Sequence, residues 1–463
     1  MMMRTTKFVW AACLSALIFI LTLVVYTTSQ SISVQLQFNV QPTTSRYPEE
    51  IKVERYITYY PHSGLHNQRL ALINAIVLAK ALDRTLIVPE MNIGKAVAWN
   101  SADRFERKMS VCPNNFKTHR DCFGFRKYVP LPAEAIFDLS AARANGVRLI
   151  HRANMSESYF EDTWSATEQD MYRVREQTRF SYRIFDTKEN NDIMYNFTQR
   201  IDIQDLAARK ERFMVFGSLH YTNRLALSDP QLNWFAHHLR EEVGLGHPVV
   251  NQQALKIVSR LGGPNNFVGV HLRQGDGFFK KLMTETITAV RLGLEQDIIP
   301  YIETNQLTIP IPSTRSLTDT ELQTIQSLQK TKNTNTLLTR CLRIHHPDNH
   351  PRLRLIYMAT DTPQPRTTLK DLHQEFPCIF TLSDFPEVIQ EALSAKPMPT
   401  GNEVVDREYA RVGTGINSLL IPMIDAEITS HASAFVGTRK STFSGYIIHR
   451  LNRLRVMYAT LSH

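Results

Sequence analysis

Three short apolar runs in the second half of the chain each end in polar residues of the kind that contact ligands. Phe267–Val270 leads into His271 and Arg273, and residues 354–360 lead into Asp361. The third run, residues 434–437, is followed by a cluster of hydroxyl residues. Apolar runs of this length are typical of buried parallel strands, and open α/β sheets bind ligands where such strands end. The sequence therefore predicts an α/β fold with a ligand site built from three strand ends.

Arg273 is the strongest single candidate for contact with a ligand. A guanidinium is permanently charged, and its planar fork can hold two oxygens of a phosphate at once. Asp276 follows three residues later and is expected to orient Arg273 or its loop. A plain salt bridge between the two residues in a structural turn is the alternative. The neighbouring strand ends, which also carry ligand-type residues, favour the phosphate interpretation.

A second anion-binding element is expected after the third apolar run. Ser441, Thr442 and Phe443 open a helical segment, so free backbone N–H groups, side-chain hydroxyls and the positive helix end would point the same way. A helix cap with no ligand is the alternative role for Ser441. The sequence thus places a cationic loop and a helix start at one sheet edge.

The first half of the chain also begins as an α/β unit. Apolar residues between 70 and 81 recur at helical spacing, and the apolar run 85–88 follows as a strand. Gly64 lies just ahead of this helix, where the absence of a Cβ lets a ligand approach the backbone. Residues 213–219 predict another strand, followed by a helix near 234–243.

These elements predict two Rossmann-like domains that face a cleft. The first would span residues 51–250 and the second residues 251–463, with a boundary near 244–263, where Gly and Pro cluster. The polar stretch 304–339 is expected to form an exposed insertion in the second domain. One amphipathic helix is predicted within it.

The N-terminus predicts a membrane anchor. Residues 8–26 are almost wholly apolar and, at 1.5 Å per residue, are long enough to cross a hydrocarbon core of about 30 Å. Basic residues precede this segment, so residues 1–7 would form a cytosolic tail and residues 27–50 a stem on the lumenal side. A cleaved signal peptide is the alternative.

Cysteine usage suits an oxidising compartment. One cysteine lies within the apolar N-terminal segment and four remain: Cys112, Cys122, Cys341 and Cys378. Pairing of the first two and of the last two is the simplest arrangement, although spacing leaves the connectivity open. A zinc site is disfavoured, since the chain has no CxxC pair. Asn154 and Asn196 begin acceptor sequons for N-glycosylation.

The motifs resemble one known family when they are taken in order. HLRQGD, YMATD and FVGTRKSTFS, preceded by HSGLHNQR at residues 62–69, resemble the GDP-fucose protein O-fucosyltransferase superfamily over about residues 56–450. The resemblance implies a GT-B type glycosyltransferase that moves L-fucose from GDP-fucose to a hydroxyl, with inversion at the anomeric carbon. It further implies a single-pass type II protein of the Golgi or endoplasmic reticulum.

The resemblance also implies roles for individual residues. Arg273 would stabilise the departing GDP, which makes it the expected catalytic residue. His271 and Asp361 would contact the ribose or guanine of the donor. Ser441, Thr442 and Phe443 would close over the diphosphate and nucleoside, and Gly64 with Asn67 would face the sugar. No metal or other cofactor is expected, because the chain lacks the DxD triplet of many metal-dependent sugar transferases and carries Arg273 instead.

One motif departs from the family pattern. Relatives that use a general base carry glutamate immediately before the loop glycine, where this chain has Ser63. His66 or His62 is the candidate for the acceptor's proton, because imidazole suits near-neutral pH. The acceptor stays open between a protein Ser or Thr and a glycan hydroxyl.

Two other functions compete with fucosyl transfer. A non-catalytic relative that binds a glycan or protein in the lumen would keep the fold, and a transferase for another nucleotide sugar such as UDP-rhamnose would keep the phosphate contacts. Nucleic acid is not an expected partner: the net charge is +9, but Lys and Arg are scattered along the chain.

Overall fold

The computed structural model describes residues 54–94, 96–115, 122, 128–156, 158–275, 277–295, 316–346 and 349–461. Val53 to His463 forms one compact unit. The predicted tail 1–7, membrane segment 8–26 and stem 27–50 lie outside the described residues, as does Asp276. Within the ranges given above, no helix is both long and apolar enough to span a bilayer.

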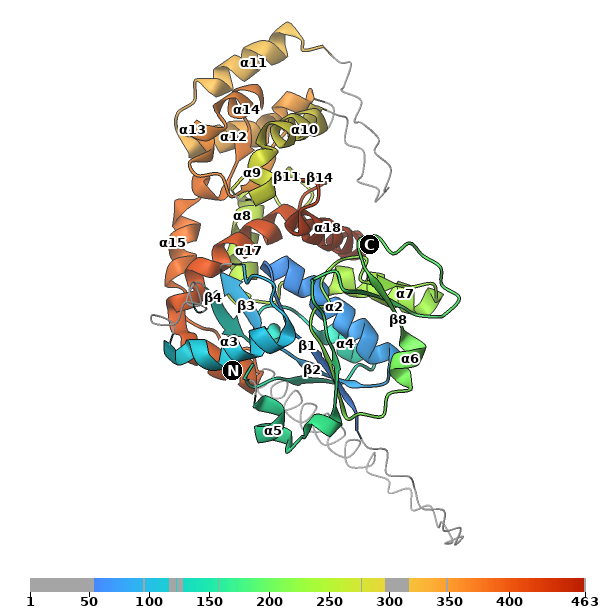
Figure 1. The fold of residues 1–463 in the computed structure, drawn as a ribbon. Coiled ribbons are helices and arrows are strands. Elements are labelled where there is room, and N and C mark those ends of the chain that lie inside the picture. Colours follow the sequence, from blue (N-terminus) through green and yellow to red (C-terminus); the bar gives the residue numbers. More distant parts are fainter. Residues whose placement is uncertain are drawn as a thin grey trace, which may run out of the picture. The chain divides into compact units, whose positions relative to one another are not determined.

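The first half of this unit contains a five-stranded parallel sheet in the order β5-β2-β1-β9-β6. Its strands are β1 (Tyr56–Tyr59), β2 (Thr85–Val88), β5 (Leu149–His151), β6 (Met171–Val174) and β9 (Phe213–Phe216). Every residue of β1, β2 and β9 is buried, which is why these strands are apolar without alternation. The expected helix is α2 (Leu65–Ala81), between β1 and β2 (Figure 1).

The second half contains a four-stranded parallel sheet in the order β13-β12-β11-β14. The strands are β11 (Val268–Leu272), β12 (Ile356–Thr360), β13 (Ile379–Phe380) and β14 (Ala434–Val436). The register pairs Leu272 with Thr360 and Val270 with Val436. The carboxyl ends of β11, β12 and β14, which lead into the candidate ligand-binding residues, therefore meet at one edge of the sheet. The predicted α/β fold with parallel sheets is confirmed.

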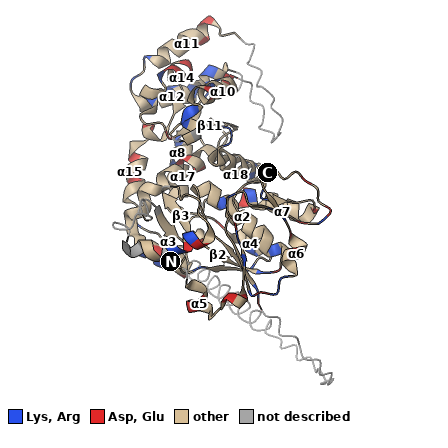
Figure 2. Ribbon diagram, in the orientation of Figure 1, with Lys and Arg blue, Asp and Glu red and all other residues tan. Residues whose placement is uncertain are grey.

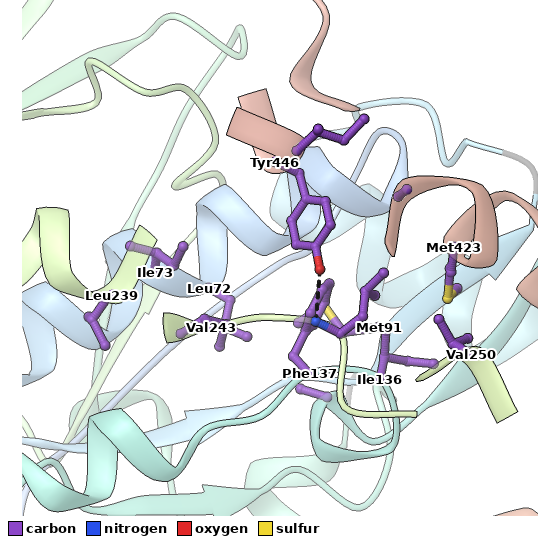
Figure 3. Packing of buried hydrophobic residues seen from close by; sticks show 14 of the residues in the cluster. Leu72, Ile73, Met91, Ile136, Phe137, Leu239, Val243, Val250, Met423 and Tyr446 are labelled. Atoms are coloured by element: carbon purple, nitrogen blue, oxygen red, sulfur yellow. Dashed lines mark hydrogen bonds between the residues drawn. The ribbon is translucent and has the colours of Figure 1, made fainter. Parts of the chain in front are cut away.

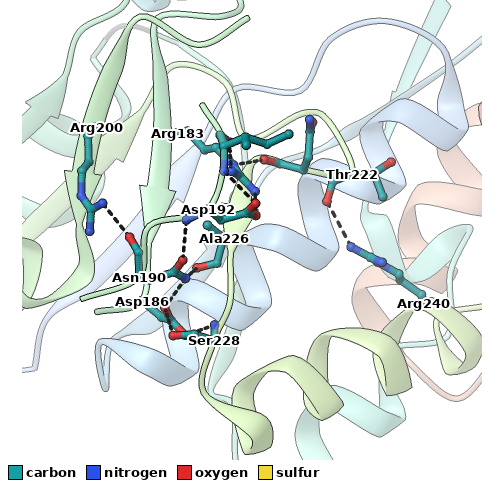
Figure 4. A network of polar contacts seen from close by, with 11 residues as sticks. Arg183, Asp186, Asn190, Asp192, Arg200, Thr222, Ala226, Ser228 and Arg240 are labelled. Atoms are coloured by element: carbon teal, nitrogen blue, oxygen red, sulfur yellow. Dashed lines mark hydrogen bonds and ion pairs between the residues drawn. The ribbon is translucent and has the colours of Figure 1, made fainter. Parts of the chain in front are cut away.

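Two smaller sheets complete the first half. Strands β3 (Met91–Gly94) and β4 (Tyr128–Leu131) form an antiparallel pair, and β10 (Leu225–Ala226), β7 (Tyr182–Phe185) and β8 (Gln199–Asp202) form a parallel sheet. Asp186 fastens the second of these (Figure 4): its carboxylate accepts from the Ser228 amide at 2.5 Å and from Asn190 Nδ2 at 2.9 Å. Neither sheet was predicted from the sequence.

One hydrophobic core joins elements from both halves. It includes side chains of α2, α7 (Pro230–Glu242), α8 (Pro248–Arg260), α17 (Asn417–Ser430) and α18 (Thr442–Leu461). Tyr446 of α18 is one of its central members (Figure 3): the ring is buried among apolar neighbours, and the hydroxyl accepts from the Leu245 amide at 3.1 Å. Packing of the last helix therefore completes the core of the first half.

Helix α8 occupies the stretch where Gly and Pro suggested a domain boundary. Pro248 is at its first position, where a missing N–H costs nothing, and Gly262 and Gly263 follow it at φ +89° and +99°. These residues therefore start and stop a helix that buries one face, which includes Val250, Ala254 and Ile257. The division into two domains stays a prediction.

The described part of the polar stretch, from residue 316 onward, contains α11 (Asp319–Gln329), the expected amphipathic helix, which buries Ile325 and Leu328. A second helix, α12 (Thr334–Ile344), was not predicted. It buries Cys341, which forms a disulfide with Cys378 just before β13. This bond fastens the stretch to the second sheet.

The other disulfide joins Cys112 of α3 (Ala102–Asn115) to Cys122. Both bonds follow the pairing preferred from the sequence.

Asn154 and Asn196, the two sequon residues, are exposed. Lys and Arg are interspersed with Asp and Glu over the ribbon (Figure 2). The remaining α-helices are α4 (Ser140–Ala144), α5 (Tyr159–Trp164), α6 (Ile203–Ala207), α9 (Gly277–Lys281), α10 (Met283–Glu295), α13 (Pro365–Thr368), α14 (Lys370–Glu375), α15 (Pro386–Ser394) and α16 (Glu403–Val412).

Candidate functional site

The loop that carries Arg273 is tied to both neighbouring strands of the second sheet. Thr438, after β14, donates from Oγ1 to the His271 carbonyl at 2.8 Å and accepts from the Arg273 amide at 3.0 Å. On the other side, Thr360 Oγ1 donates to the Leu272 carbonyl at 2.7 Å. The backbone at Arg273 is therefore fixed before any ligand binds.

Asp361 secures the next residues of the same loop. Its two carboxylate oxygens accept from the amides of Gln274 at 2.8 Å and Gly275 at 3.0 Å. A Cβ at Gly275 would lie 2.7 Å from Asp361 Oδ2, so this contact requires glycine. The family resemblance implies contact of Asp361 with the ribose or guanine. The structure adds a second role, anchoring the Arg273 loop, while Asp361 stays exposed at the sheet edge.

Arg273 itself is half-buried. Its guanidinium lies over the ring of Phe279 in α9, with 4.9 Å between the guanidinium carbon and the ring centroid. A cation over an aromatic face is attracted by the ring quadrupole, which limits the orientations open to the side chain. A strand end and an aromatic ring thus position the cation.

Helix α18 begins beside this loop. The first hydrogen bond of the helix runs from the Gly445 amide to the Ser441 carbonyl at 3.0 Å. The amides of Thr442 and Phe443 come before this bond, so they have no partner within the helix. The buried Ser441 hydroxyl accepts from the Ser444 amide at 3.5 Å, a long capping contact. Both expected properties, a capped helix start and outward N–H groups, coexist here.

Phe443 joins the two halves of the chain at this point. Its ring stacks on His271 with centroids 4.4 Å apart, and it meets His66 of α2 edge-on at 5.2 Å. His66 also stacks on Tyr446 at 4.6 Å, and His271 Nδ1 forms a 2.7 Å hydrogen bond with Ser444 Oγ. The motif at residues 62–69 is therefore in contact with the start of α18, beside the Arg273 loop.

The two histidines are buried and held neutral. Burial, followed by the charges of Arg69, His271 and Arg273, lowers the pKa of His66 to about 3. Burial and the charge of Arg273 lower the pKa of His271 to about 3. The His66 side chain is only 7% exposed, because the rings of Phe443 and Tyr446 lie against it. This environment disfavours His66 as the base expected from the sequence.

The loop before α2 has an unusual backbone. Ser63 adopts a positive φ of 69°, and its amide and carbonyl pair with Val97 at 2.6 and 3.3 Å. Gly64 has ordinary extended angles, and a Cβ there would meet nothing closer than Asn67 Nδ2 at 4.0 Å. The space that Gly64 leaves is therefore open, as the prediction of close ligand approach requires.

Polar residues at the carboxyl edge of the first sheet were not predicted from the sequence. Ser218 follows β9 and is completely buried, and Glu176 follows β6 at 7% exposure. A signal was present, because Gly217, Ser218 and His220 follow an apolar run in the same way as the motifs of the second half. In the residues that the structure describes, no group of three or more His, Cys, Asp or Glu side chains is arranged to hold a metal ion.

Comparison with known proteins gives one family match. The model of the family described as GDP-fucose protein O-fucosyltransferase matches residues 56–452. A comparison with curated protein sequences returned no significant match.

Several solved structures are similar to this chain. POFUT1 in complex with GDP-fucose has 14% identity and a TM-score of 0.37, over 87% of this chain and 95% of that one. The fucosyltransferase NodZ from Bradyrhizobium has 12% identity and a TM-score of 0.35, over 85% of this chain and 92% of NodZ. NodZ α-1,6-fucosyltransferase crystallised with GDP has 11% identity and a TM-score of 0.34, over 85% and 91%. At these values no residue role follows from the likeness.

Proposed function

The chain belongs to the GDP-fucose protein O-fucosyltransferase family and is therefore a glycosyltransferase. On that premise we propose that it transfers L-fucose from GDP-fucose to an acceptor hydroxyl, with inversion and without a metal ion. The observation that carries the proposal is the fixed Arg273 loop beside the open first turn of α18. The two elements supply a cation and free N–H groups at one edge of a parallel sheet.

The proposed chemistry depends on stabilising the departing GDP. As the bond from the anomeric carbon to the phosphate breaks, negative charge develops on the bridging oxygen and the β-phosphate. Arg273 would meet that charge directly, and the amides of Thr442 and Phe443 would add donors at the helix N-terminus. Groups already held in place cost little reorganisation when the charge develops, so a metal ion is not needed.

The remaining donor contacts follow from position. Asp361 presents an exposed carboxylate beside the Arg273 loop, where it can accept from ribose or guanine. His271 donates or accepts through Nδ1 to Ser444, so its part is to hold the first turn of α18 and the face of Phe443. We place the sugar toward Gly64 and Asn67, across from that turn.

The acceptor and the compartment are also proposals. Either a protein Ser or Thr or a glycan hydroxyl suits the chemistry. A type II arrangement in the Golgi or endoplasmic reticulum, with a GT-B catalytic part in the lumen, is supported by two disulfides and by the exposure of Asn154 and Asn196.

Nucleotide-dependent thermal stabilisation of the full-length chain tests the donor. A ligand that binds only the folded state stabilises it by about 2.7 kcal/mol at a hundred times its Kd. We expect GDP to raise the melting temperature more than UDP does, and Arg273→Ala to weaken the GDP effect. Preference for UDP would instead support a UDP-sugar transferase. Stabilisation by neither nucleotide, with no GDP released from GDP-fucose, would support a non-catalytic binding protein.

A further inference from the structure

A hydrogen-bonded chain of three side chains lies at the carboxyl edge of the five-stranded sheet. His62 follows β1, and its Nδ1 is 2.8 Å from Ser63 Oγ. Its Nε2 is 2.6 Å from the hydroxyl of Ser218, which follows β9. His62 is 4% exposed and Ser218 is fully buried, whereas Ser63 is half-buried. The chain therefore runs from the protein interior to the loop that leads into Gly64.

The backbone holds the outer end of this chain in place. Ser63 has the left-handed φ of 69°, a conformation that costs a non-glycine residue about 1 kcal/mol or more and persists only where the surroundings enforce it. Two backbone hydrogen bonds with Val97 enforce it here. At the inner end, the His220 amide donates to Ser218 Oγ at 3.4 Å. Both hydroxyls thus stay within reach of the imidazole.

The surroundings keep the His62 ring neutral in the resting protein. Burial, followed by the nearby His220 and the charges of Arg224 and Arg179, lowers the pKa of His62 to about 3. A neutral imidazole accepts at one nitrogen and donates at the other. His62 can therefore accept from Ser63 at Nδ1 while donating from Nε2 to Ser218.

We propose that Ser63 and His62 form a proton relay that deprotonates the acceptor hydroxyl, and that Ser218 holds the His62 ring in place for it. The inference rests on the proposed fucosyl transfer and names the group that the reaction still lacks. The acceptor oxygen forms a bond to the anomeric carbon of fucose, and the bond from that carbon to the phosphate oxygen breaks, with its electron pair leaving on GDP. The acceptor proton passes to Ser63 Oγ while the proton of Ser63 passes to His62 Nδ1. After product release, His62 gives the proton to water through Ser63.

A base of low pKa suffices for this late proton transfer. Once the acceptor oxygen has begun to bond to an oxocarbenium-like carbon it carries positive charge, and its proton becomes strongly acidic. A neutral imidazole is then a sufficient acceptor, and burial keeps His62 in that form at neutral pH by lowering its pKa to about 3. His66 is equally neutral but its ring is enclosed by Phe443 and Tyr446, whereas the relay ends at the half-buried Ser63.

Azide separates a relay from a structural role, since it attacks carbon but has no proton to give up. The measurement is GDP release from GDP-fucose by the full-length chain, with water alone or with added sodium azide. We expect Ser63→Ala and His62→Gln to slow the water reaction by about a hundredfold or more, within the range of general base catalysis. Azide should restore GDP release to the wild-type rate, with fucosyl azide as the product. Ser394→Ala, an exposed serine of α15, is the matched control.

Three results would decide against the relay or its premise. A wild-type water reaction in both variants would overturn it. Slow release that azide does not restore, in variants that GDP still stabilises against heat, would assign the residues a structural role instead. If the unaltered protein neither binds GDP nor releases it from GDP-fucose, the proposed function itself fails, and that outcome is distinguishable because it precedes any substitution.

Discussion

Phe443 lies nearly parallel to His271, with ring centroids 4.4 Å apart and an interplanar angle of 28°. The pair links the first turn of α18 to the end of β11, because the same histidine also bonds Ser444. The helix start that would receive the diphosphate is therefore held against the strand that delivers Arg273.

Replacing the ring should loosen that helix start. Phe443→Ala removes the stack on His271 and the edge contact with His66, and aromatic pairs of this kind are worth about 0.5–1.5 kcal/mol each. We expect GDP affinity to fall by about tenfold, measured by titration calorimetry. Val456→Ala, at an exposed position of the same helix, should bind GDP normally. Unchanged GDP affinity in Phe443→Ala would show that the stacking of Phe443 on His271 does not contribute to donor binding.

Arg273 should act mainly in the transition state. Arg273→Ala is expected to lower kcat by about a hundredfold or more, as loss of a charge directed at the leaving group does. Arg273→Lys should recover little, because a point charge cannot hold two oxygens as a guanidinium does. Steady-state rates with GDP-fucose measure both variants. Near-normal turnover in either would make Arg273 a structural residue.

The Arg273 loop should not tolerate a side chain at Gly275. The added methyl of Gly275→Ala would lie 2.7 Å from Asp361 Oδ2, so the carboxylate must move and release the two amides that it holds. We expect a loss of kcat of about tenfold, since small displacements of catalytic groups have effects of this size. Gly415→Ala, where no atom lies within 4 Å of the new Cβ, is the control. Equal rates in the two variants would show that the loop position is not critical.

Glu176 should make stability depend on pH. Burial raises the pKa of its carboxyl to about 7, although the Trp99 N–H and the charge of Arg224 oppose that rise. An unfolded glutamate ionises near its ordinary value of 4.5, so the stabilisation from a protonated Glu176 is present below that value and is lost as pH rises through 7. As the pH rises from 5 to 8, the free energy of unfolding of wild type should therefore fall relative to that of Glu176→Gln. The difference is about 2–3 kcal/mol at most.

Urea unfolding at the two pH values measures this difference. Glu161→Gln, which replaces an exposed glutamate, is the matched control. A Glu176→Gln effect of equal size at pH 5 and pH 8 would mean that the carboxyl is not protonated in the folded protein.

Activity should survive an excess of chelator. The charge that balances GDP in the proposed mechanism comes from Arg273 and the amides of the α18 start, all of them protein groups. Release of GDP from GDP-fucose with and without EDTA measures the effect. Loss of activity on chelation, with recovery on adding manganese or magnesium, would contradict the metal-free part of the proposal.

The sequence predicted the elements whose burial is uniform along the chain. β9 and β14 are apolar throughout and β11 and β12 are apolar over most of their length, because both faces of a parallel sheet are covered. Their order in the sheets was not readable, since it depends on contacts between segments far apart in the chain. Helix α8 was missed for a different reason: its flanking Pro248 and Gly262 are equally typical of a linker.

The ligand-type residues of the site were identified from strand ends, but their partners were not. In the sequence Asp361 is an acid after an apolar run, and only its hydrogen bonds with the Gln274 and Gly275 amides show that it anchors their loop. The contact between His66 and Phe443 joins opposite ends of the chain, so no local pattern could predict it. Glu176 escaped notice because strand β6 is only partly buried and lacks an apolar run.

The packing of α2 against α18 affects the order in which the protein can mature. Arg69 of α2 is 2% exposed, and its guanidinium lies over Tyr446 of α18, 5.0 Å from the ring centroid. Arg69 and Tyr446 are far apart in the sequence, so α2 has no partner here until the ribosome has synthesised α18. Contacts of such long sequence separation slow folding and leave apolar surface exposed in the meantime. A nascent chain that stops short of α18 would present chaperones with an open first-half core and no donor site.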